Sequence, residues 1–182
     1  MAVSYANRGL ALEDLIETAN RQYFMQNIAI IHKVPSKWIP IRNKDGKIVT
    51  AKIETRSIVD FIGRYYDMPI AFDAKSVLNE EKWYLRNLED HQYQFLKKWE
   101  TEKSKAFVLF GFWKTEEFFF VPFRYIHLKR LLWKKGGPAS IKLQELRRDY
   151  PVIPLNKGRT VLDYLSVIDD QNYEAIAFYE SK

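Results

Sequence analysis

The stretch from Ser57 to Lys75 carries two acidic residues and a lysine in an arrangement that can perform hydrolytic chemistry. Asp60 stands at the end of one short apolar strand, and after a turn a second apolar strand carries Asp73-Ala-Lys75. Because side chains alternate along a strand, Asp73 and Lys75 lie on the same face. Two carboxylates can hold Mg²⁺, and an ammonium beside them can hold an attacking water or offset charge that grows on a phosphate. The stretch therefore predicts metal-assisted hydrolysis of a phosphodiester bond.

A simpler interpretation treats Asp60 as a turn cap and the Asp73–Lys75 pair as a surface ion pair on an edge strand. The tripeptide Asp-x-Lys is common by chance, so on its own it favours the surface ion pair. The flanking strands, Ile58–Ile62 and Ile70–Phe72, are however too apolar for solvent-facing edges. A further acid upstream also favours the hydrolytic interpretation.

That further acid is Glu13, in a segment whose spacing predicts a helix over residues 8–26. Asn27 follows where a left-handed residue would end the helix. Glu13 flanks the apolar stripe, so we expect its carboxylate to lean toward the strands that bear the other acids. The stripe itself has the helical spacing i, i+3, i+4, i+7 and i+11, with Leu12, Leu15, Ile16, Ala19 and Tyr23.

Composition narrows the class of protein. The 182 residues are 47% hydrophobic and 15% aromatic, enough for the core of a single domain. The absence of cysteine excludes disulfides and thiolate metal sites. The three histidines are far apart in the sequence, which argues against a zinc site. No apolar run reaches the roughly 18 residues of a membrane span, and the first residues lack the pattern of a secretory signal. We expect a cytoplasmic protein without a membrane partner.

The net charge of +6 is concentrated in two segments. Residues 33–56 hold seven basic residues against two acidic ones, and residues 124–148 hold eight against one. Such local excesses suit a polyanionic partner. Basic surfaces are also common in proteins without such a partner. The positive charge therefore supports a polyanionic partner only in combination with the predicted cluster of acidic residues.

The remaining elements predict an α/β fold: one domain over residues 1–182 with a mixed central β-sheet flanked by helices. A basic β-hairpin is predicted at about residues 36–55, with Asp45-Gly46 in a type I′ turn. It is either a charged edge that prevents aggregation or a finger that contacts nucleic acid. The other predicted elements are a strand at 28–32, helices at 87–103, 123–134 and 142–148, strands at 106–112 and 117–122, and a closing helical turn or two within 161–168.

Large aromatic residues in the late segments exceed what one small sheet obviously needs. This surplus predicts that some of them line an interface between two copies of the chain. The residues are Phe107, Phe110, Phe112, Trp113, Phe118 and Phe120.

With these elements in place, the chain resembles the RecU-type Holliday-junction resolvases, a branch of the PD-(D/E)-x-K nuclease superfamily. The similarity runs in order through nearly the whole chain. The segments that carry it are Asn7-Arg-Gly9 with Leu12-Glu13, Ile28–Lys33, Ser57–Gly63, Ile70–Lys75, Leu85–Gln92, Phe119–Phe123 and Leu162–Leu165.

The resemblance implies a restriction-endonuclease-like core and a homodimeric, Mg²⁺-dependent endonuclease that nicks a four-way DNA junction symmetrically; Mn²⁺ is expected to substitute. It makes Glu13, Asp60 and Asp73 the metal ligands, Lys75 the catalytic lysine and Gln92 an assisting residue. The hairpin would be the family's stalk. A nucleoid location and a recombinase or branch-migration partner would follow from the same resemblance. The predicted DNA-binding residues are Arg8, Lys33, Lys37, Arg42, Lys44, Lys47, Lys52 and Arg56.

Two alternatives stay open at this stage. A non-catalytic DNA-binding or recombination accessory protein on a nuclease fold predicts at least one disabled catalytic position, and the sequence has none. A repair- or restriction-type nuclease that cuts linear duplex would keep the chemistry but usually needs a module that reads sequence.

Overall fold

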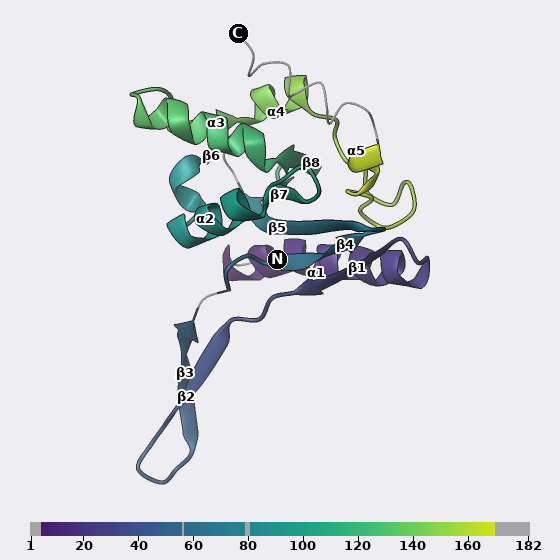
Figure 1. The fold of residues 1–182 in the computed structure, drawn as a ribbon. Helices are drawn as coiled ribbons and strands as arrows, with labels where there is room; N and C mark the ends of the chain where they lie inside the picture. Colours follow the sequence, from purple (N-terminus) through teal and green to yellow (C-terminus); the bar gives the residue numbers. More distant parts are fainter. Residues whose placement is uncertain (1–4, 56, 79–80, 170–182) are drawn as a thin grey trace.

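A five-stranded sheet runs through the centre of the molecule, and helices cover both of its faces (Figure 1). The structure is a computed structural model and describes residues 5–55, 57–78 and 81–169. Its helices are α1 (Tyr5–Met25), the 3₁₀ helix η1 (Leu85–Asn87), α2 (Asp90–Trp99), α3 (Phe123–Lys134), α4 (Leu143–Asp149) and α5 (Ser166–Asp169). Its strands are β1 (Ala29–Lys33), β2 (Lys37–Arg42), β3 (Ile48–Thr55), β4 (Phe61–Tyr65), β5 (Met68–Val77), β6 (Lys82–Tyr84), β7 (Lys105–Phe112), β8 (Glu117–Pro122) and β9 (Ser140–Lys142).

The central sheet is mixed, as predicted. Its strand order is β1-β4-β5-β7-β8, in which β5 and β7 are parallel and the other neighbours are antiparallel. Parallel neighbours need a crossover connection, and the chain between β5 and β7 contains α2. This crossover brings α2 against the strand that carries Asp73 and Lys75.

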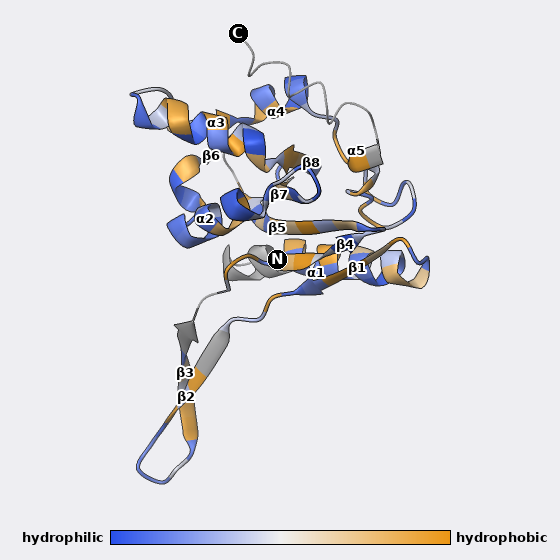
Figure 2. Cartoon of the chain, viewed as in Figure 1, coloured by the Kyte–Doolittle hydropathy of each residue, from blue (hydrophilic) through white to orange (hydrophobic). Residues whose placement is uncertain are grey.

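Strand β5 is buried on both faces because α1 covers one and α2 the other. Ile70 and Phe72 pack in the core beneath α1, whereas Ala71 packs in the core on the α2 side. Figure 2 shows apolar residues along β5 and on the side of α1 that meets the sheet. A strand buried on both faces reads as a continuous apolar run, and a charged residue in it is exceptional.

Strands β1 and β4 approach each other closely at Gly63. A Cβ atom at this position would lie 2.1 Å from the backbone oxygen of Ile30. Only glycine fits there, so Gly63 permits the pairing that sets the position of the chain just before β4, where Asp60 lies.

The predicted hairpin forms a separate two-stranded antiparallel sheet, β2–β3, that extends away from the rest of the chain (Figure 1). The prediction of a type I′ turn in this hairpin is wrong. That turn needs a positive φ at both central residues, and only Gly46 has one, at 77°. Asn43 shapes the turn instead, because its side-chain oxygen accepts hydrogen bonds from the backbone N–H groups of Asp45 and Lys47.

Two other expectations need correction. The helix α2 spans less than the predicted 87–103, whereas α5 agrees with the closing helical turn that was predicted near residues 161–168. The small sheet β6–β9 was not predicted at all. Five of the six late aromatics belong to the core of the single chain, which argues against their predicted interface role: Phe107, Phe110, Phe112, Phe118 and Phe120 are at most 2% exposed, and Trp113 is partly buried.

Candidate active site

Asp60 and Asp73 come together because β4 and β5 pair in an antiparallel register. Phe61 pairs with Phe72, so the residues just beyond this pair, Asp60 and Asp73, lie side by side. The backbone N–H of Ala74 donates a hydrogen bond to Asp60 Oδ2 at 2.8 Å. The two acids that the sequence singled out are therefore neighbours.

Asp73 and Lys75 point to the same side of β5, as the strand period predicted. The Lys75 ammonium forms an ion pair with Asp73 Oδ2. The Asp73 carboxyl is fully buried, whereas the Lys75 side chain retains 17% of its exposure. The pair is thus a half-enclosed charge pair on a central strand, which excludes the simpler interpretation of a surface ion pair on an edge.

Gln92 joins the cluster from the first turn of α2. Its Nε2 donates to Asp73 Oδ1 at 2.6 Å, and its Oε1 accepts from Lys75 Nζ at 3.2 Å. The backbone N–H of Glu89, at the start of α2, also donates to Oε1 at 3.2 Å. One side-chain amide therefore contacts both Asp73 and Lys75 while it is itself anchored to the end of the helix.

The environment raises the pKa of Asp73 to about 8. Burial is the main cause, because an ionised carboxylate loses its hydration; the nearby Lys75 ammonium acts in the opposite direction, and the Asp60 carboxylate raises the pKa further. A bound cation would oppose this rise, because it stabilises the ionised carboxylate. Strong perturbation of a buried acid beside charged partners is typical of functional sites.

Glu13 lies apart from this cluster in the structure. It is on α1, which packs on the opposite face of β5 from α2, and its carboxylate pairs with Lys33 Nζ at 2.9 Å. Lys33 also donates to Glu17 Oε1 at 2.8 Å, and these contacts raise its pKa. Lys33 and Glu13 thus pair with each other in the structure. This ion pair competes with the predicted phosphate contact of Lys33 and with the predicted metal role of Glu13.

The acids that are present suit Mg²⁺ better than a metal that needs a full protein cage. Within the ranges that the structure describes, no three His, Cys, Asp or Glu side chains are close enough to form a metal-binding group. Asp60 and Asp73 provide two carboxylates, and the buried Asp73 Oδ2 faces the Lys75 ammonium. Mg²⁺ is usually held by one or two carboxylates, with waters and substrate phosphates completing its shell.

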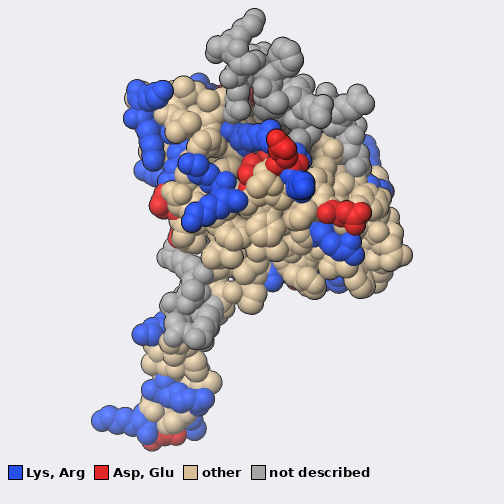
Figure 3. All heavy atoms as spheres, viewed as in Figure 1, with Lys and Arg blue, Asp and Glu red and all other residues tan. Residues whose placement is uncertain are grey.

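The predicted DNA-binding side chains on the hairpin are exposed. Arg42 donates to the backbone oxygen of Gly46 at 2.8 Å, and Lys44, Lys47 and Lys52 project from the same β2–β3 unit. Figure 3 shows Lys and Arg gathered at the tip of the hairpin. The side chains of the other three predicted residues lie outside the part that the structure describes: Arg8, Lys37 and Arg56.

Arg130 is a residue of the site that the sequence reasoning missed. Its side chain is only 12% exposed, and its guanidinium lies 4.1 Å from the ring centroid of Tyr93, the neighbour of Gln92. It also donates to Asp90 Oδ1 at 3.0 Å and to the backbone oxygen of Leu88 at 3.4 Å. Arg130 therefore holds the first turn of α2, which carries Gln92. Helical spacing could have revealed it, because it falls at i+7 from Phe123, on the buried stripe of α3.

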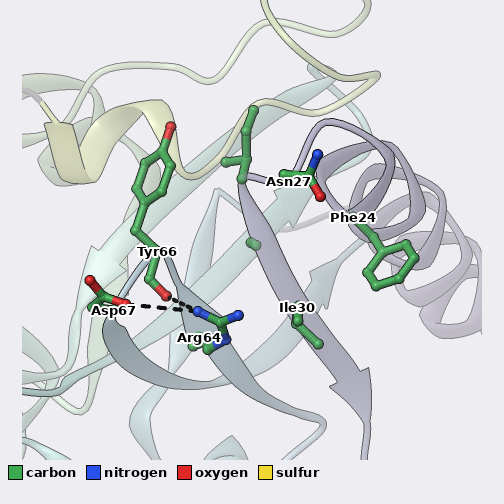
Figure 4. A pocket seen from close by; sticks show the side chains of 8 residues that line it. Phe24, Asn27, Ile30, Arg64, Tyr66 and Asp67 are labelled. Carbon is green, nitrogen blue, oxygen red and sulfur yellow. Dashed lines mark hydrogen bonds and ion pairs between the residues drawn. The ribbon is translucent and has the colours of Figure 1, made fainter.

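A pocket of about 210 Å³ at the far end of α1 contains none of the predicted site residues (Figure 4). Phe24 and Tyr66 border it, and Arg64 Nη1 donates to the backbone oxygen of Tyr66 at 2.8 Å and lies 3.9 Å from Asp67. It has no pair of acids, so the candidate chemistry stays with the Asp60–Asp73 cluster. Among the described helices, none is long and apolar enough to cross a membrane.

A mixed sheet that places one acid ahead of a strand, and an acid and a lysine two residues apart on the next, is the arrangement of the nuclease class that the sequence resembles. Comparison with known proteins then narrows the class. The family described as "Recombination protein U", RecU, matches residues 7–170. The chain is 31% identical over 173 residues to proteins named "Holliday junction resolvase RecU" from Staphylococcus aureus strains MRSA252, JH9 and JH1; the match covers 92% of this chain and 82% of each relative. The chain belongs to the RecU family.

Proposed function

We propose that this protein is a divalent-metal-dependent endonuclease that resolves four-way DNA junctions by paired, symmetric nicks. The proposal rests on one observation. Asp60 just before β4, Asp73 and Lys75 on β5, and Gln92 on α2 form one cluster. The names of its relatives supply the substrate class. The cluster supplies the chemistry.

Asp60 and Asp73 would hold Mg²⁺, or Mn²⁺ in its place. When bound, such an ion polarises the scissile phosphate and neutralises charge on the leaving oxygen. Lys75 presents an ammonium at the partly exposed edge of the cluster, where it can orient the attacking water or stabilise charge on the phosphate. Gln92 fixes Asp73 and Lys75 relative to each other by bonding to both.

Glu13 enters this proposal conditionally. It can serve as the third acid only if Lys33 releases it, since the two side chains form an ion pair. DNA phosphate offers Lys33 an alternative anionic partner, so substrate binding could free Glu13. Lys33 would then contact DNA, as the sequence analysis predicted.

We further propose that residues 1–182 act as one nuclease domain in which the β2–β3 insertion contacts the junction as a stalk. The hairpin carries exposed cations together with exposed apolar residues, including Ile48 at 58% and Val49 at 61% exposure. Cations suit phosphates, and apolar side chains suit the unstacked bases at a junction centre.

Paired nicks require two copies of the single cluster, so we propose a homodimer with two-fold symmetry. The buried aromatics give this proposal no support, and it rests on the symmetry of the substrate and on the family resemblance. Light scattering at micromolar concentration checks it: a monomer that still cuts both strands would contradict it. By extension we propose a cytoplasmic, nucleoid-associated location and cooperation with a recombinase or branch-migration machinery.

Two alternatives remain as competitors. An accessory protein without catalysis should lack part of the cluster, and all of its members are present and in contact. A duplex-cutting nuclease would act equally on linear DNA.

One gel separates these functions. A labelled four-way junction and a linear duplex of the same sequence are incubated with the protein in Mg²⁺ and, separately, in Ca²⁺. We expect cleavage of the junction alone in Mg²⁺ and binding without cleavage in Ca²⁺. Asp73→Asn should abolish cleavage and spare binding, because it removes a buried metal-facing charge and retains its shape.

Asp67→Asn is the matched control, since it makes the same chemical change at an exposed acid away from the cluster. It should cleave like the wild type. Cleavage by Asp73→Asn near the wild-type rate would refute the site, and equal cleavage of linear duplex would favour the second alternative.

A further inference from the structure

The small sheet β6–β9 places two lysines directly opposite each other. Its antiparallel register pairs Lys82 with Lys142, Trp83 with Ile141 and Tyr84 with Ser140. Trp83 and Ile141 are buried, with 3% and 0% exposure. Because side chains alternate along a strand, both lysines and Tyr84 lie on the outer face of the sheet. We refer to this outer face of β6–β9, with the adjoining Arg86, as the ribbon surface.

Like charges directly opposite each other destabilise a strand pair. An anion bound between the two charges would offset this repulsion. The ribbon surface has space for one: Lys82, Tyr84 and Lys142 line an open pocket of about 560 Å³ together with Glu81 and Gln144.

A third cation and an aromatic ring complete this surface. The guanidinium of Arg86 lies 5.0 Å from the ring centroid of Tyr84, and the Lys82 ammonium lies 5.1 Å from the same centroid. Interleaved cations and aromatic rings are typical of nucleic-acid-binding surfaces.

The carboxylates near the ribbon surface already have other partners. Glu145 pairs with Lys129, and Glu117 pairs with Arg147. Within the described residues neither Arg86 nor Lys142 forms an ion pair, and Glu81 is the one acid that lines the pocket. The charges of Arg86 and Lys142 are therefore available to an external anion.

The ribbon surface is also attached to the element that carries Gln92. The backbone N–H of Leu85 donates to the oxygen of Ala139 at 3.0 Å, and η1 leads directly into α2. Trp83 and Leu85 pack in the same core cluster as Tyr93 of α2, on the face of the sheet that bears Asp73. An anion bound here lies on the side of the sheet where the candidate chemistry takes place.

We propose that the ribbon surface binds the phosphodiester backbone of a DNA arm next to the strand that is cut. Lys82, Lys142 and Arg86 contact successive phosphates without reading bases. This inference rests on the proposed function for its choice of DNA as the polyanion. It adds a phosphate-binding site beyond the hairpin.

The test measures binding of a fluorescently labelled four-way junction by anisotropy, in EDTA, over a series of KCl concentrations. Each phosphate contact contributes about 0.9 to the slope of log K against log salt. The double variant Lys82→Gln/Lys142→Gln should reduce that slope by about 1.8, and adding Arg86→Gln should reduce it further. At about 0.1 M salt the double variant should bind roughly tenfold to a hundredfold more weakly.

The control is Lys114→Gln/Lys157→Gln, which removes the same charge from two exposed lysines outside the ribbon surface and should leave the slope unchanged. Lys142→Glu places a carboxylate opposite Lys82, so it favours the strand pair while it repels phosphate. A folded Lys142→Glu protein that binds with a wild-type slope would overturn the inference.

The readout is independent of cleavage. If the wild-type protein cuts junctions and the slope of the double variant is unchanged, the ribbon surface fails and the proposed function stands. If the wild type cuts nothing but the slope falls as expected, the proposed function fails and the phosphate site stands.

Discussion

The two basic segments of the chain look alike in sequence and differ in the fold. In residues 33–56, the hairpin cations Arg42, Lys44, Lys47 and Lys52 are exposed and extend away from the body. In residues 124–148, five of the eight cations form ion pairs within the body: Arg124 with Glu100, Lys129 with Glu145, Arg130 with Asp90, Arg147 with Glu117 and Arg148 with Asp149.

The comparison shows that the net charge of a segment is not the same as the charge that is accessible to a partner. Figure 3 shows blue and red side chains lying against one another on the body, whereas blue predominates at the tip of the hairpin. The first segment is therefore expected to contribute to DNA affinity. The second is expected to contribute mainly to stability, with Lys142 on the ribbon surface as the exception.

Removal of the hairpin charges should have the largest effect. Arg42→Gln/Lys44→Gln/Lys47→Gln/Lys52→Gln should weaken junction binding by roughly 10²–10³-fold at about 0.1 M salt, because about four counterion-releasing contacts are lost. The free energy of unfolding should change by less than about 0.5 kcal/mol, since the side chains are exposed. Anisotropy and urea unfolding measure the two quantities.

The control for this variant is Lys129→Gln/Arg147→Gln/Arg148→Gln, which removes three of the ion-paired cations of the second segment. Its affinity should change by no more than a few-fold. Equal losses in both variants would show that pairing within the fold does not withhold charge from DNA.

Arg130→Ala should lower the free energy of unfolding by about 1–3 kcal/mol. The variant loses the cation–π contact with Tyr93 and the hydrogen bonds to Asp90 and Leu88. Cleavage should fall with it, because the turn that positions Gln92 loosens, while the salt slope of binding should stay unchanged. Lys134→Ala on the same helix is the control and should be close to neutral. A reduced salt slope in Arg130→Ala would instead place Arg130 on the DNA.

Arg124→Gln should cost about 1–2 kcal/mol, since it leaves Glu100, whose side chain is 9% exposed, without its cation. Burial raises the pKa of Glu100, and Arg124 opposes that rise. A raised carboxyl pKa means that the native state binds more protons than the unfolded state, so stability falls as the pH rises above the ordinary glutamate range. Without Arg124 this fall should steepen on the alkaline side of the ordinary glutamate pKa. Urea titrations at acidic and at neutral pH give the measurement, and an unchanged dependence of stability on pH would contradict it.

Arg147→Gln should have the smallest effect. Its pair with Glu117 is solvent-accessible, with 46% of the arginine side chain exposed, and such pairs contribute little to stability. Thermal unfolding at low and high salt should show a small difference that salt removes. A loss of stability as large as that of Arg130→Ala would mean that solvent exposure does not decide how much a charged contact contributes.

Local patterns predicted the elements that hold the candidate site. The helix at 123–134 agrees with α3 at both ends, and Asn27 has the left-handed φ of 57° that its position after α1 predicted. The shared face of Asp73 and Lys75 follows from the strand period alone. These properties depend on residues a few positions apart, so the sequence displays them directly.

Contacts between distant segments could not be predicted in the same way. Lys82 and Lys142 pair across strands of three residues each, too short to show a period. The ion pair of Glu13 with Lys33 depends on how α1 lies across the sheet. The resemblance pointed to Gln92, whereas its bond to Asp73 required the position of α2.

The sequence by itself determined which groups this protein can use: two acids, a lysine on the same strand face, and the net positive charge. Only the tertiary structure decided what state those groups are in. The raised pKa of Asp73 arises because α2 and the sheet exclude water from a carboxylate that its own strand would leave solvated. The second segment lost much of its available charge because folding brought distant carboxylates against it. Charge is a property of the residue, but hydration and partners belong to the packing.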